Sequence, residues 1–219
     1  MHGLSVVIPA LNAETLLAGT LKSIGPGPEL IVVDGGSADR TARIAAGAGA
    51  RVLAAPRGRG SQIAAGVAAA SQPWLLILHA DTRPGQGWRQ AVAAHMAAPD
   101  SAGHFRFVLD APGARARRLE RLVAWRCRVL GLPYGDQGLL IHRDLLRAVG
   151  GVKPLPLMED VDLVRRLGRW RLRLLPADAV TSAARWEREG YLRRSARNLL
   201  CLSLWFAGVP PRIIRRLYE

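Results

Sequence analysis

The chain has 219 residues, 49% of them apolar, which suffices for the core of one globular domain and excludes a disordered chain. Its formal net charge of +14 comes almost entirely from arginine and fits nucleic acid, anionic lipid or a phosphorylated substrate as a partner. A biased genome explains the same charge, so charge alone selects no partner. The longest apolar run, residues 199–209, is shorter than the ~20 residues that span a bilayer, so we expect a soluble or surface-bound protein.

The first half of the chain alternates short apolar runs with helical patterns. The runs are apolar on both faces, which is typical of strands buried in a parallel sheet, and they cover residues 4–9, 30–34, 51–55 and 74–78. Between them, one helical face runs through Leu16 and Ile24 with Asn12 as its capping candidate, and Ser37 can cap a second helix. This alternation predicts a doubly wound α/β layer.

After residue 81 the pattern becomes mixed. Expected helices cover residues 88–97, 115–130 and 159–167, and expected strands cover residues 103–110, 138–142, 171–176 and 179–184. Arg-rich amphipathic helices follow at residues 191–207 and 211–218. Cys127 and Cys201 lie on separate helices without metal-ligand spacing, so we expect free core thiols in a reducing cytosol. The pattern predicts one catalytic domain over residues 1–190 and a helical tail, residues 191–219, that packs on it or on a membrane surface.

Ligands of an open parallel sheet bind beyond the carboxyl ends of its strands. In this sequence those ends carry Pro9, Ala10, Leu11 and Asn12, then Asp34 and Gly35, then Arg57 and Arg59, and finally His79, Ala80 and Asp81. Asp34 can accept hydrogen bonds from a ribose or a base, or it can cap its own turn. The stretch "PRGRG" can cradle a phosphate, or it can form an ordinary solvated turn.

A group of carboxylates follows the Pro-rich stretch "KPLPLM". Glu159 and Asp160 stand side by side at an expected helix start, and Asp162 comes two residues later. Acidic residues stabilise a helix N-terminus electrostatically, which is a purely structural explanation. An irregular loop in this position is also a common setting for a catalytic base. The polar segments "GDQG" at 135–138 and "ARWEREG" at 184–190 are further candidates for a binding site.

Five motifs occur in an ordered, spaced series: "SVVIPALN", "IVVDGGSADRT", "LLILHADT", "GDQGLLIHRDLLRAVGG" and "MEDVDLVRRL". Through them, residues 4–186 resemble the nucleotide-sugar glycosyltransferases of family 2, which have the GT-A fold. The resemblance implies an α/β fold with a doubly wound, mostly parallel sheet, helices on both faces and a C-terminal helical tail. "LHADT" together with "GDQG" is similar to the bacterial branch described as radical-SAM/selenodomain-associated, a label for genomic neighbourhood and not for a substrate.

The resemblance also implies roles for individual residues. Asp160 matches the catalytic base, and Asp81 matches the last carboxylate of the family's Asp-x-Asp motif, which binds Mg²⁺ or Mn²⁺ on the donor diphosphate. The implied donor-binding residues are Pro9, Ala10, Leu11, Asn12, Asp34, Gly35, Arg57, Arg59, Gln62, His79, Ala80 and Asp81. The implied acceptor-binding residues are Asp136, Gln137, Glu159, Arg185 and Trp186. A base on one side of the sugar and a cation on the other suit displacement at an anomeric carbon.

Several positions depart from the family pattern. His79 replaces the first Asp of Asp-x-Asp, which removes a negative charge and favours contact with ribose or diphosphate over the metal. The Glu of the family's Asn-Glu pair is displaced by one residue to Glu14. Ile63 and Ala64 occupy the position of the family's Arg-Asn pair, with Gln62 as the candidate substitute. Ser182 replaces the Gln of the Gln-x-x-Arg-Trp motif of processive synthases, which argues against a polymerising enzyme.

These observations predict an inverting, metal-dependent glycosyltransferase that moves one sugar from a nucleoside diphosphate, with uridine as the expected nucleoside, to an unknown acceptor. A sugar nucleotidyltransferase is the first alternative, although "PALNAET" lacks the Gly-rich, basic loop that it needs. The second alternative is a non-catalytic, basic domain that binds a membrane or nucleic acid. Without an aromatic stacking platform we expect no nucleic acid. The expected location is cytoplasmic. The sequence leaves open whether the protein contacts anionic lipid of the inner membrane and whether it forms a homodimer.

Overall fold

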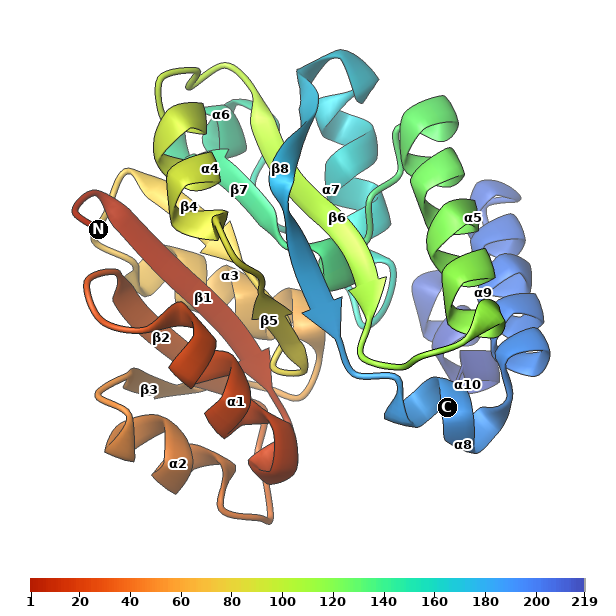
Figure 1. Ribbon diagram of the computed structural model, residues 1–219, viewed down its shortest axis with the longest axis horizontal. Coiled ribbons are helices and arrows are strands. Elements are labelled where there is room, and N and C mark those ends of the chain that lie inside the picture. The colour runs from red at the N-terminus through yellow and green to blue at the C-terminus, as the bar shows by residue number, and fades with distance from the viewer. Residues whose placement is uncertain (219) are drawn as a thin grey trace.

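The computed structural model describes residues 1–218 and builds them around an eight-stranded sheet (Figure 1). The strand order is β3-β2-β1-β4-β7-β6-β8-β5. The strands are β1 (Leu4–Ala10), β2 (Glu29–Asp34), β3 (Arg51–Ala54), β4 (Trp74–Ile77), β5 (Thr82–Pro84), β6 (Ala102–Leu109), β7 (Leu139–His142) and β8 (Leu172–Thr181). The α-helices are α1 (Glu14–Ile24), α2 (Thr41–Gly47), α3 (Arg59–Ala69), α4 (Trp88–His95), α5 (Ala114–Leu130), α6 (Arg143–Ala148), α7 (Glu159–Leu167), α8 (Ala184–Glu189), α9 (Tyr191–Phe206) and α10 (Pro211–Tyr218). The 3-10 helices are η1 (Gly135–Gln137) and η2 (Arg169–Arg171).

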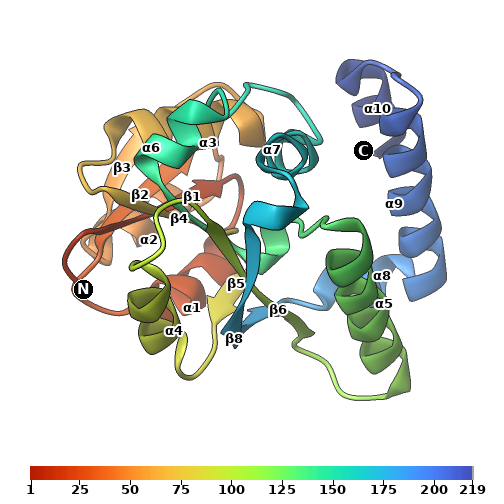
Figure 2. The same cartoon turned by 90° about the horizontal axis from the view of Figure 1, so that it is seen from above.

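Helices cover both faces of the sheet (Figure 2). Alternate residues of β1 belong to opposite layers, because Val6 and Ile8 share a core with α1 and α4 whereas Val7 shares one with α3 and α7. Strands β1 to β4 are joined by parallel pairings, and β1 and β4 are buried along their whole length, which explains their continuous apolar runs. The predicted doubly wound, mostly parallel α/β architecture is confirmed.

The second half of the sheet is mixed. β7 pairs antiparallel with β4 and β6, whereas β6 and β8 pair in parallel. The prediction of two separate strands at residues 171–176 and 179–184 is wrong, because β8 is one continuous strand. Its register with β6 shifts between His104 and Arg106. The bulge at this shift accommodates Pro176, which has no N–H to donate to the sheet.

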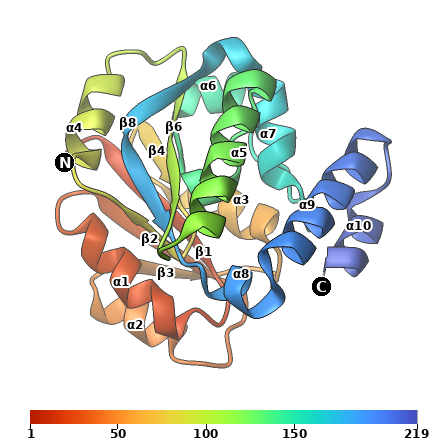
Figure 3. The same cartoon turned by 45° about the vertical axis from the view of Figure 1, so that its right-hand side comes forward.

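Residues 191–218 form a hairpin of α9 and α10 at one end of the molecule (Figures 2 and 3). Leu202 of α9 packs in one cluster with Val161 of α7. Cys201, a buried free thiol, packs with Ile214 of α10. The hairpin is therefore held by α7, the helix that also carries Asp160, the predicted base. Within the described part of the chain, no helix has both the length and the apolar character needed to cross a membrane.

Candidate active site

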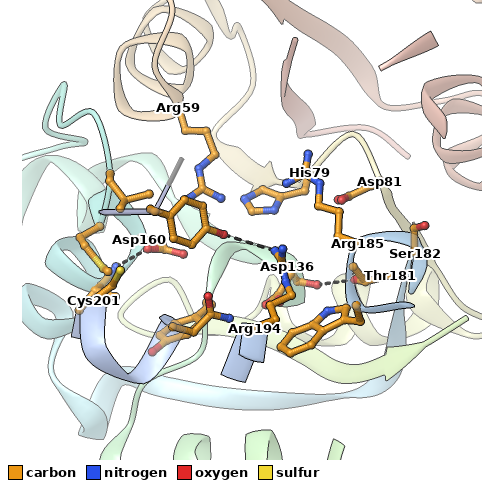
Figure 4. A pocket seen from close by; sticks show the side chains of 17 residues that line it. Arg59, His79, Asp81, Asp136, Asp160, Thr181, Ser182, Arg185, Arg194 and Cys201 are labelled. Atoms are coloured by element: carbon orange, nitrogen blue, oxygen red, sulfur yellow. Dashed lines mark hydrogen bonds between the residues drawn. The ribbon is translucent and has the colours of Figure 1, made fainter. Parts of the chain in front are cut away.

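Two adjoining depressions lie beyond the carboxyl ends of β1 and β4. The first, which we call the strand-end groove, is lined by Pro9, Ala10, Leu11, Asn12, Arg57, Arg59, Gln62, His79, Ala80 and Asp81, among others. The second, which we call the inner pocket, is lined by Asp136, Asp160, Arg185 and Trp186, among others (Figure 4). Arg59, His79 and Asp81 line both. The fold thus brings most of the predicted donor residues to the groove and most of the predicted acceptor residues to the pocket.

Asp34 and Gly35 are not among the residues that line either depression. The Asp34 carboxylate accepts hydrogen bonds from the N–H groups of Gly36 and Ser37, at 3.1 and 3.0 Å. It also accepts one from the Ser37 hydroxyl. Asp34 therefore caps its own turn, which is the structural alternative that its sequence context allows.

Asn12 and Ser37, which the sequence pattern presents as helix caps, tie two loops together instead. The Ser37 hydroxyl oxygen accepts from the Asn12 N–H at 2.9 Å, and the Asn12 side chain accepts from the Ala38 N–H at 2.9 Å. Among residues 1–218, Asn12 (φ 48°) and Met158 (φ 65°) are the non-glycine residues with a left-handed φ, and each lines one of the two depressions. Such conformations cost of order 1–3 kcal/mol and concentrate at functional sites.

Gln62 is a buried brace between the ends of β1 and β2. Its Nε2 donates to the carbonyl oxygens of Ala10 and Val33, each at 2.7 Å. The turn after β2 lies directly on this amide, because a Cβ added to Gly35 would come within 3.1 Å of it. The amide nitrogen that was a candidate for donor contact is therefore already used to hold two strand ends together.

The turn after β4 presses the ring of His79 against η1. A Cβ added to Gly135 would lie 2.4 Å from Nε2 of His79, so this contact requires glycine. The Gly135 N–H in turn donates to Oδ2 of Asp160 at 2.9 Å. Burial, assisted by the charge of Arg59, lowers the pKa of His79 to about 4. The imidazole is therefore neutral at pH 7, and one glycine backbone separates it from the Asp160 carboxylate.

Asp81 stands where the groove and the pocket meet. The strand that follows it, β5, pairs antiparallel with the end of β8. The hydroxyls of Thr82 and Thr181 lie 3.0 Å apart, and the Ser182 N–H donates to the Asp81 carbonyl oxygen at 3.1 Å. Beyond the end of β4 at Ile77, the chain crosses here to pair with the end of β8. The crossing fixes the backbone of Asp81 at the edge of both depressions.

Arg59 and Glu159 form an ion pair beside the same junction. The Arg59 Nε lies 3.0 Å from Oε1 of Glu159, whose side chain is 1% exposed. The start of α3 approaches the loop before α7 so closely that a Cβ on Gly60 would come within 2.5 Å of the Leu155 carbonyl oxygen. Burial raises the pKa of Glu159 to about 7, and the guanidinium of Arg59 opposes that rise. Glu159 is not among the residues that line the inner pocket, and its contact with the site runs through Arg59.

The 3-10 helix η1 sends its polar side chains in different directions. Asp136 lines the inner pocket, and its buried Oδ1 has no hydrogen-bond partner within residues 1–218. Burial raises the pKa of Asp136 to about 6, and the nearby Asp160 adds to the rise. Gln137 instead donates to the Phe105 carbonyl oxygen at 3.1 Å and accepts from Arg126 at 3.3 Å. Gln137, a predicted acceptor-binding residue, is not among the residues that line the inner pocket, because its amide bonds to β6 and α5.

The inner pocket also contains residues that the sequence motifs do not identify. They include Tyr134, Thr181, Arg194, Asn198, Cys201 and Tyr218, the last four from the α9–α10 hairpin. Arg194 donates to Glu189 at 3.0 Å and lies over the Trp186 ring, 5.0 Å from its centroid. No local sequence motif identifies these residues, because the tertiary packing of distant segments brings them to the pocket. One sequence signal could have found three of them. Arg194, Asn198 and Cys201 recur at i, i+4 and i+7, so they lie on one side of a helix. A helix side that only packs against the core is usually apolar, so a side with Arg and Asn points to a binding site.

The pocket offers carboxylate oxygens and no ready-made metal cluster. Over residues 1–218, no group of three or more His, Cys, Asp and Glu side chains is placed to hold a metal ion. A cation such as Mg²⁺, however, often uses one or two carboxylates and completes its shell with waters and substrate phosphates. Asp81, a hard oxygen ligand at the junction, fits a cation that is shared with a diphosphate.

A doubly wound, mostly parallel sheet with a groove and a pocket of charged residues beyond its strand ends is the architecture of an α/β enzyme of the GT-A type. The family model described as glycosyl transferase family 2 matches residues 5–142. The chain therefore belongs to glycosyl transferase family 2, which confirms the family suggested by the motifs.

Curated relatives of the chain include uncharacterized glycosyltransferases of Mycobacterium bovis and Mycobacterium tuberculosis, each 45% identical over 78 residues. The similarity covers 35% of this chain and 36% of each relative. The chain thus spans about a third of the length of the curated relatives that it matches.

Solved structures share the fold over most of the chain. Glucosyl-3-phosphoglycerate synthase of Mycobacterium tuberculosis, in complex with Mn²⁺, uridine diphosphate and glucosyl-3-phosphoglycerate, has a TM-score of 0.56 and 23% identity over 81% of this chain and 70% of that one. S. aureus TarS 1-349 has a TM-score of 0.65 and 15% identity over 98% and 69%. Mannosyl-3-phosphoglycerate synthase of Rubrobacter xylanophilus has a TM-score of 0.59 and 18% identity over 94% and 75%. At these identities the likeness establishes the fold.

Proposed function

We propose that the chain is an inverting glycosyltransferase that moves one sugar from a uridine-diphosphate sugar to an acceptor hydroxyl. The observation that carries this proposal is that Asp81 and Asp160 line the inner pocket from opposite sides, with His79 and Arg59 along the wall between them (Figure 4). A cation-assisted departure on one side and a base on the other is what a single displacement requires. The strand-end groove, which meets the pocket at Asp81, supplies the place for the nucleotide.

In the proposed reaction, Asp160 accepts the proton of the acceptor hydroxyl while that oxygen bonds to the anomeric carbon. The bond from the anomeric carbon to the diphosphate oxygen breaks, and the nucleoside diphosphate leaves with the electron pair. One displacement of this kind inverts the anomeric configuration. The N–H groups of Gly135 and Val161 donate to the two Asp160 carboxylate oxygens at 2.9 and 2.8 Å, which orients the base.

The donor is proposed to lie in the strand-end groove, with its base and ribose against residues 9–12. Arg57 and Arg59 line this groove and would flank the diphosphate, and the neutral His79 would donate to ribose or diphosphate. Asp81 would hold Mg²⁺ or Mn²⁺, which would neutralise charge on the departing diphosphate. Two structures with this fold support the donor class, since the glucosyl-3-phosphoglycerate synthase is crystallised with uridine diphosphate and Mn²⁺ and TarS with UDP-GlcNAc.

The acceptor is proposed to enter the inner pocket between η1 and α9. Asp136, Arg185 and Trp186, which the family resemblance assigns to acceptor binding, line this pocket, and Arg194 and Asn198 line it from α9. Asp136 supports this placement because its buried oxygen without a partner is ready to accept from an acceptor hydroxyl.

A panel of nucleotide sugars tests this proposal by thermal shift, with Mn²⁺ and with chelator. A ligand that binds only the folded state raises its melting temperature by mass action, so a uridine-diphosphate sugar should stabilise the protein more with Mn²⁺ than without. NMR of the product should then show the inverted anomer. Stabilisation by uridine triphosphate and a sugar 1-phosphate instead, with release of pyrophosphate, would show a nucleotidyltransferase. A product of retained configuration would refute the single displacement.

A further inference from the structure

The positive charge of the chain is unevenly distributed along the sequence. Residues 1–113 contain 9 Arg and Lys against 7 Asp and Glu, whereas residues 114–219 contain 22 against 10. The second part therefore carries a formal charge of +12 out of the total of +14. A composition bias that acted equally over the whole chain would not produce this asymmetry, so the charge needs a local explanation.

Helix α5 exposes a stripe of apolar side chains among arginines. Leu122, Trp125 and Val129 are 63%, 52% and 42% exposed, and their spacing of three and four residues puts them on one side of the helix. The other side packs against β6 through Leu119 and Val123. The exposed arginines of the same helix include Arg115, Arg118, Arg121 and Arg128. An exposed tryptophan in such a stripe leaves a large apolar surface open to water.

Helix α9 repeats the pattern and connects it to the active site. Leu192, Leu199 and Phe206 recur every seven residues and are 88%, 63% and 50% exposed. Arg194 and Asn198, on a different side of the same helix, line the inner pocket. Exposed arginines accompany this stripe on α9 and α10, namely Arg193, Arg212 and Arg216. One helix thus carries a pocket wall and an outward apolar stripe.

We propose that these two stripes and their arginines form a face that docks the protein on an anionic lipid bilayer. The three views agree that α5 and α9 lie at the same end of the molecule, away from β3 (Figures 1, 2 and 3). Leucine, tryptophan and phenylalanine side chains enter the boundary between headgroups and acyl chains, while arginines meet the lipid phosphates. Docking through this stripe places α9 between the lipid surface and the inner pocket, since Arg194 and Asn198 lie on a different side of the helix.

Charge favours a bilayer over other occupants of this face. Two copies that paired through it would bring the arginines of one against those of the other, and like charges repel. Nucleic acid would engage the arginines but would leave Leu199 and Phe206 in water. An anionic bilayer uses the charge and the apolar side chains together. The inference does not depend on the proposed reaction.

Flotation of the full-length protein with vesicles tests the inference without any substrate. The vesicles are phosphatidylcholine alone and an equal mixture of phosphatidylcholine and phosphatidylglycerol, each at low and at high salt. The test variant is Leu122→Ser/Leu199→Ser, and the matched control is Leu174→Ser on β8, because all three leucines are 63% exposed. We expect wild type and control to bind the mixed vesicles, less at high salt, and the double variant to bind them at least about tenfold more weakly.

Three results of the vesicle experiment would overturn the inference. They are equal binding to neutral and anionic vesicles, absence of binding to the mixed vesicles, and unchanged binding of the double variant. Light scattering without lipid should show a monomer, and a dimer that the double variant dissociates would assign the face to a second copy instead. The substitutions replace exposed side chains, so equal melting temperatures are expected. A charge-reversed variant, Arg118→Glu/Arg193→Glu, keeps the apolar stripes and should also lose the anionic preference.

Discussion

His79 and Gly135 lie so close together that the imidazole fills the space that a side chain on Gly135 would need. A Cβ there would be 2.4 Å from Nε2 of His79, and the Gly135 N–H donates to Asp160 at 2.9 Å. His79 follows β4, whereas Asp160 belongs to the first turn of α7. A residue without a side chain therefore sets the separation between the donor side and the base side of the inner pocket.

Gly135→Ala should damage catalysis more than folding. The added methyl group must displace His79 or the η1 backbone that orients Asp160, and a shift of about 1 Å at reacting groups can cost ~10²-fold in rate. We expect turnover at least about tenfold below wild type, measured by steady-state kinetics. Gly47→Ala is the control, because a Cβ at Gly47 meets no atom within 4 Å. Wild-type turnover in Gly135→Ala would mean that the spacing is unimportant.

Gln62 is expected to matter for stability. Gln62→Ala removes a buried amide that donates to Ala10 and Val33 at 2.7 Å each, and it leaves both carbonyl oxygens without that donor. The free energy of unfolding should fall by roughly 1–3 kcal/mol in urea titrations, since two buried hydrogen bonds worth ~0.5–1.5 kcal/mol each are lost. Gln90→Ala, an exposed glutamine on α4, should change it by less than about 0.5 kcal/mol. A loss of nucleotide affinity without any loss of stability would instead make Gln62 a donor ligand.

Asp136 should make a pH-dependent contribution to stability. Burial raises its pKa to about 6, so the folded protein holds this proton more tightly than the unfolded chain does. The resulting stabilisation is complete below about pH 4 and is lost as the pH rises from about 4 to about 6. Asp136→Asn removes that loss, so its free energy of unfolding relative to wild type should rise by about 2 kcal/mol between pH 4 and pH 7.

Urea titrations at both pH values measure this difference. Asp144→Asn, whose side chain is 75% exposed, is the control and should show no such change. Comparison of each variant with wild type at the same pH cancels the contribution of His79, whose pKa is lowered and which therefore acts with the opposite sign. A difference between Asp136→Asn and wild type that stays constant with pH would contradict the raised pKa of Asp136.

Removal of the metal should separate the roles of Asp81 and His79. A hard divalent cation gains more from a carboxylate and diphosphate oxygens than from a neutral imidazole. In calorimetric titrations of uridine diphosphate with Mn²⁺ or with chelator, Asp81→Ala should lose the metal-stimulated part of binding. His79→Ala should bind more weakly in both conditions and keep the response to metal. The opposite pattern would exchange the two roles.

Much of the strand-end groove could be predicted because parallel strands deliver their carboxyl ends to one edge of a sheet. His79, Asp81 and residues 9–12 do line the groove. The same rule does not reveal which side chains turn inward. Asp34 stands at a strand end and bonds to its own turn, and Gln137 shares a motif with Asp136 but faces the core.

The tail's contribution to the pocket could not be predicted from local patterns. Arg194 and Tyr218 reach the inner pocket because Leu202 packs α9 against α7, and such a long-range contact leaves no signature in a short window of sequence. The predicted end of a strand at Pro176 was wrong, because only the register with β6 shows that a bulge accommodates this proline within β8. The radical-SAM/selenodomain branch and the cytoplasmic location stay predictions from the motifs and the composition.

The central claim is that Asp160 is the base, and turnover of Asp160→Asn measured beside its affinity for uridine diphosphate tests it most directly. Asparagine keeps the size of the side chain and can still accept the Gly135 N–H, but it cannot take a proton at neutral pH. Asp144→Asn provides a matched control on an exposed surface. We predict that Asp160→Asn lowers turnover by ~10²-fold or more and leaves nucleotide affinity nearly unchanged, the usual scale for loss of a general base. Wild-type turnover in Asp160→Asn would contradict the account and leave Asp160 with the task of capping α7.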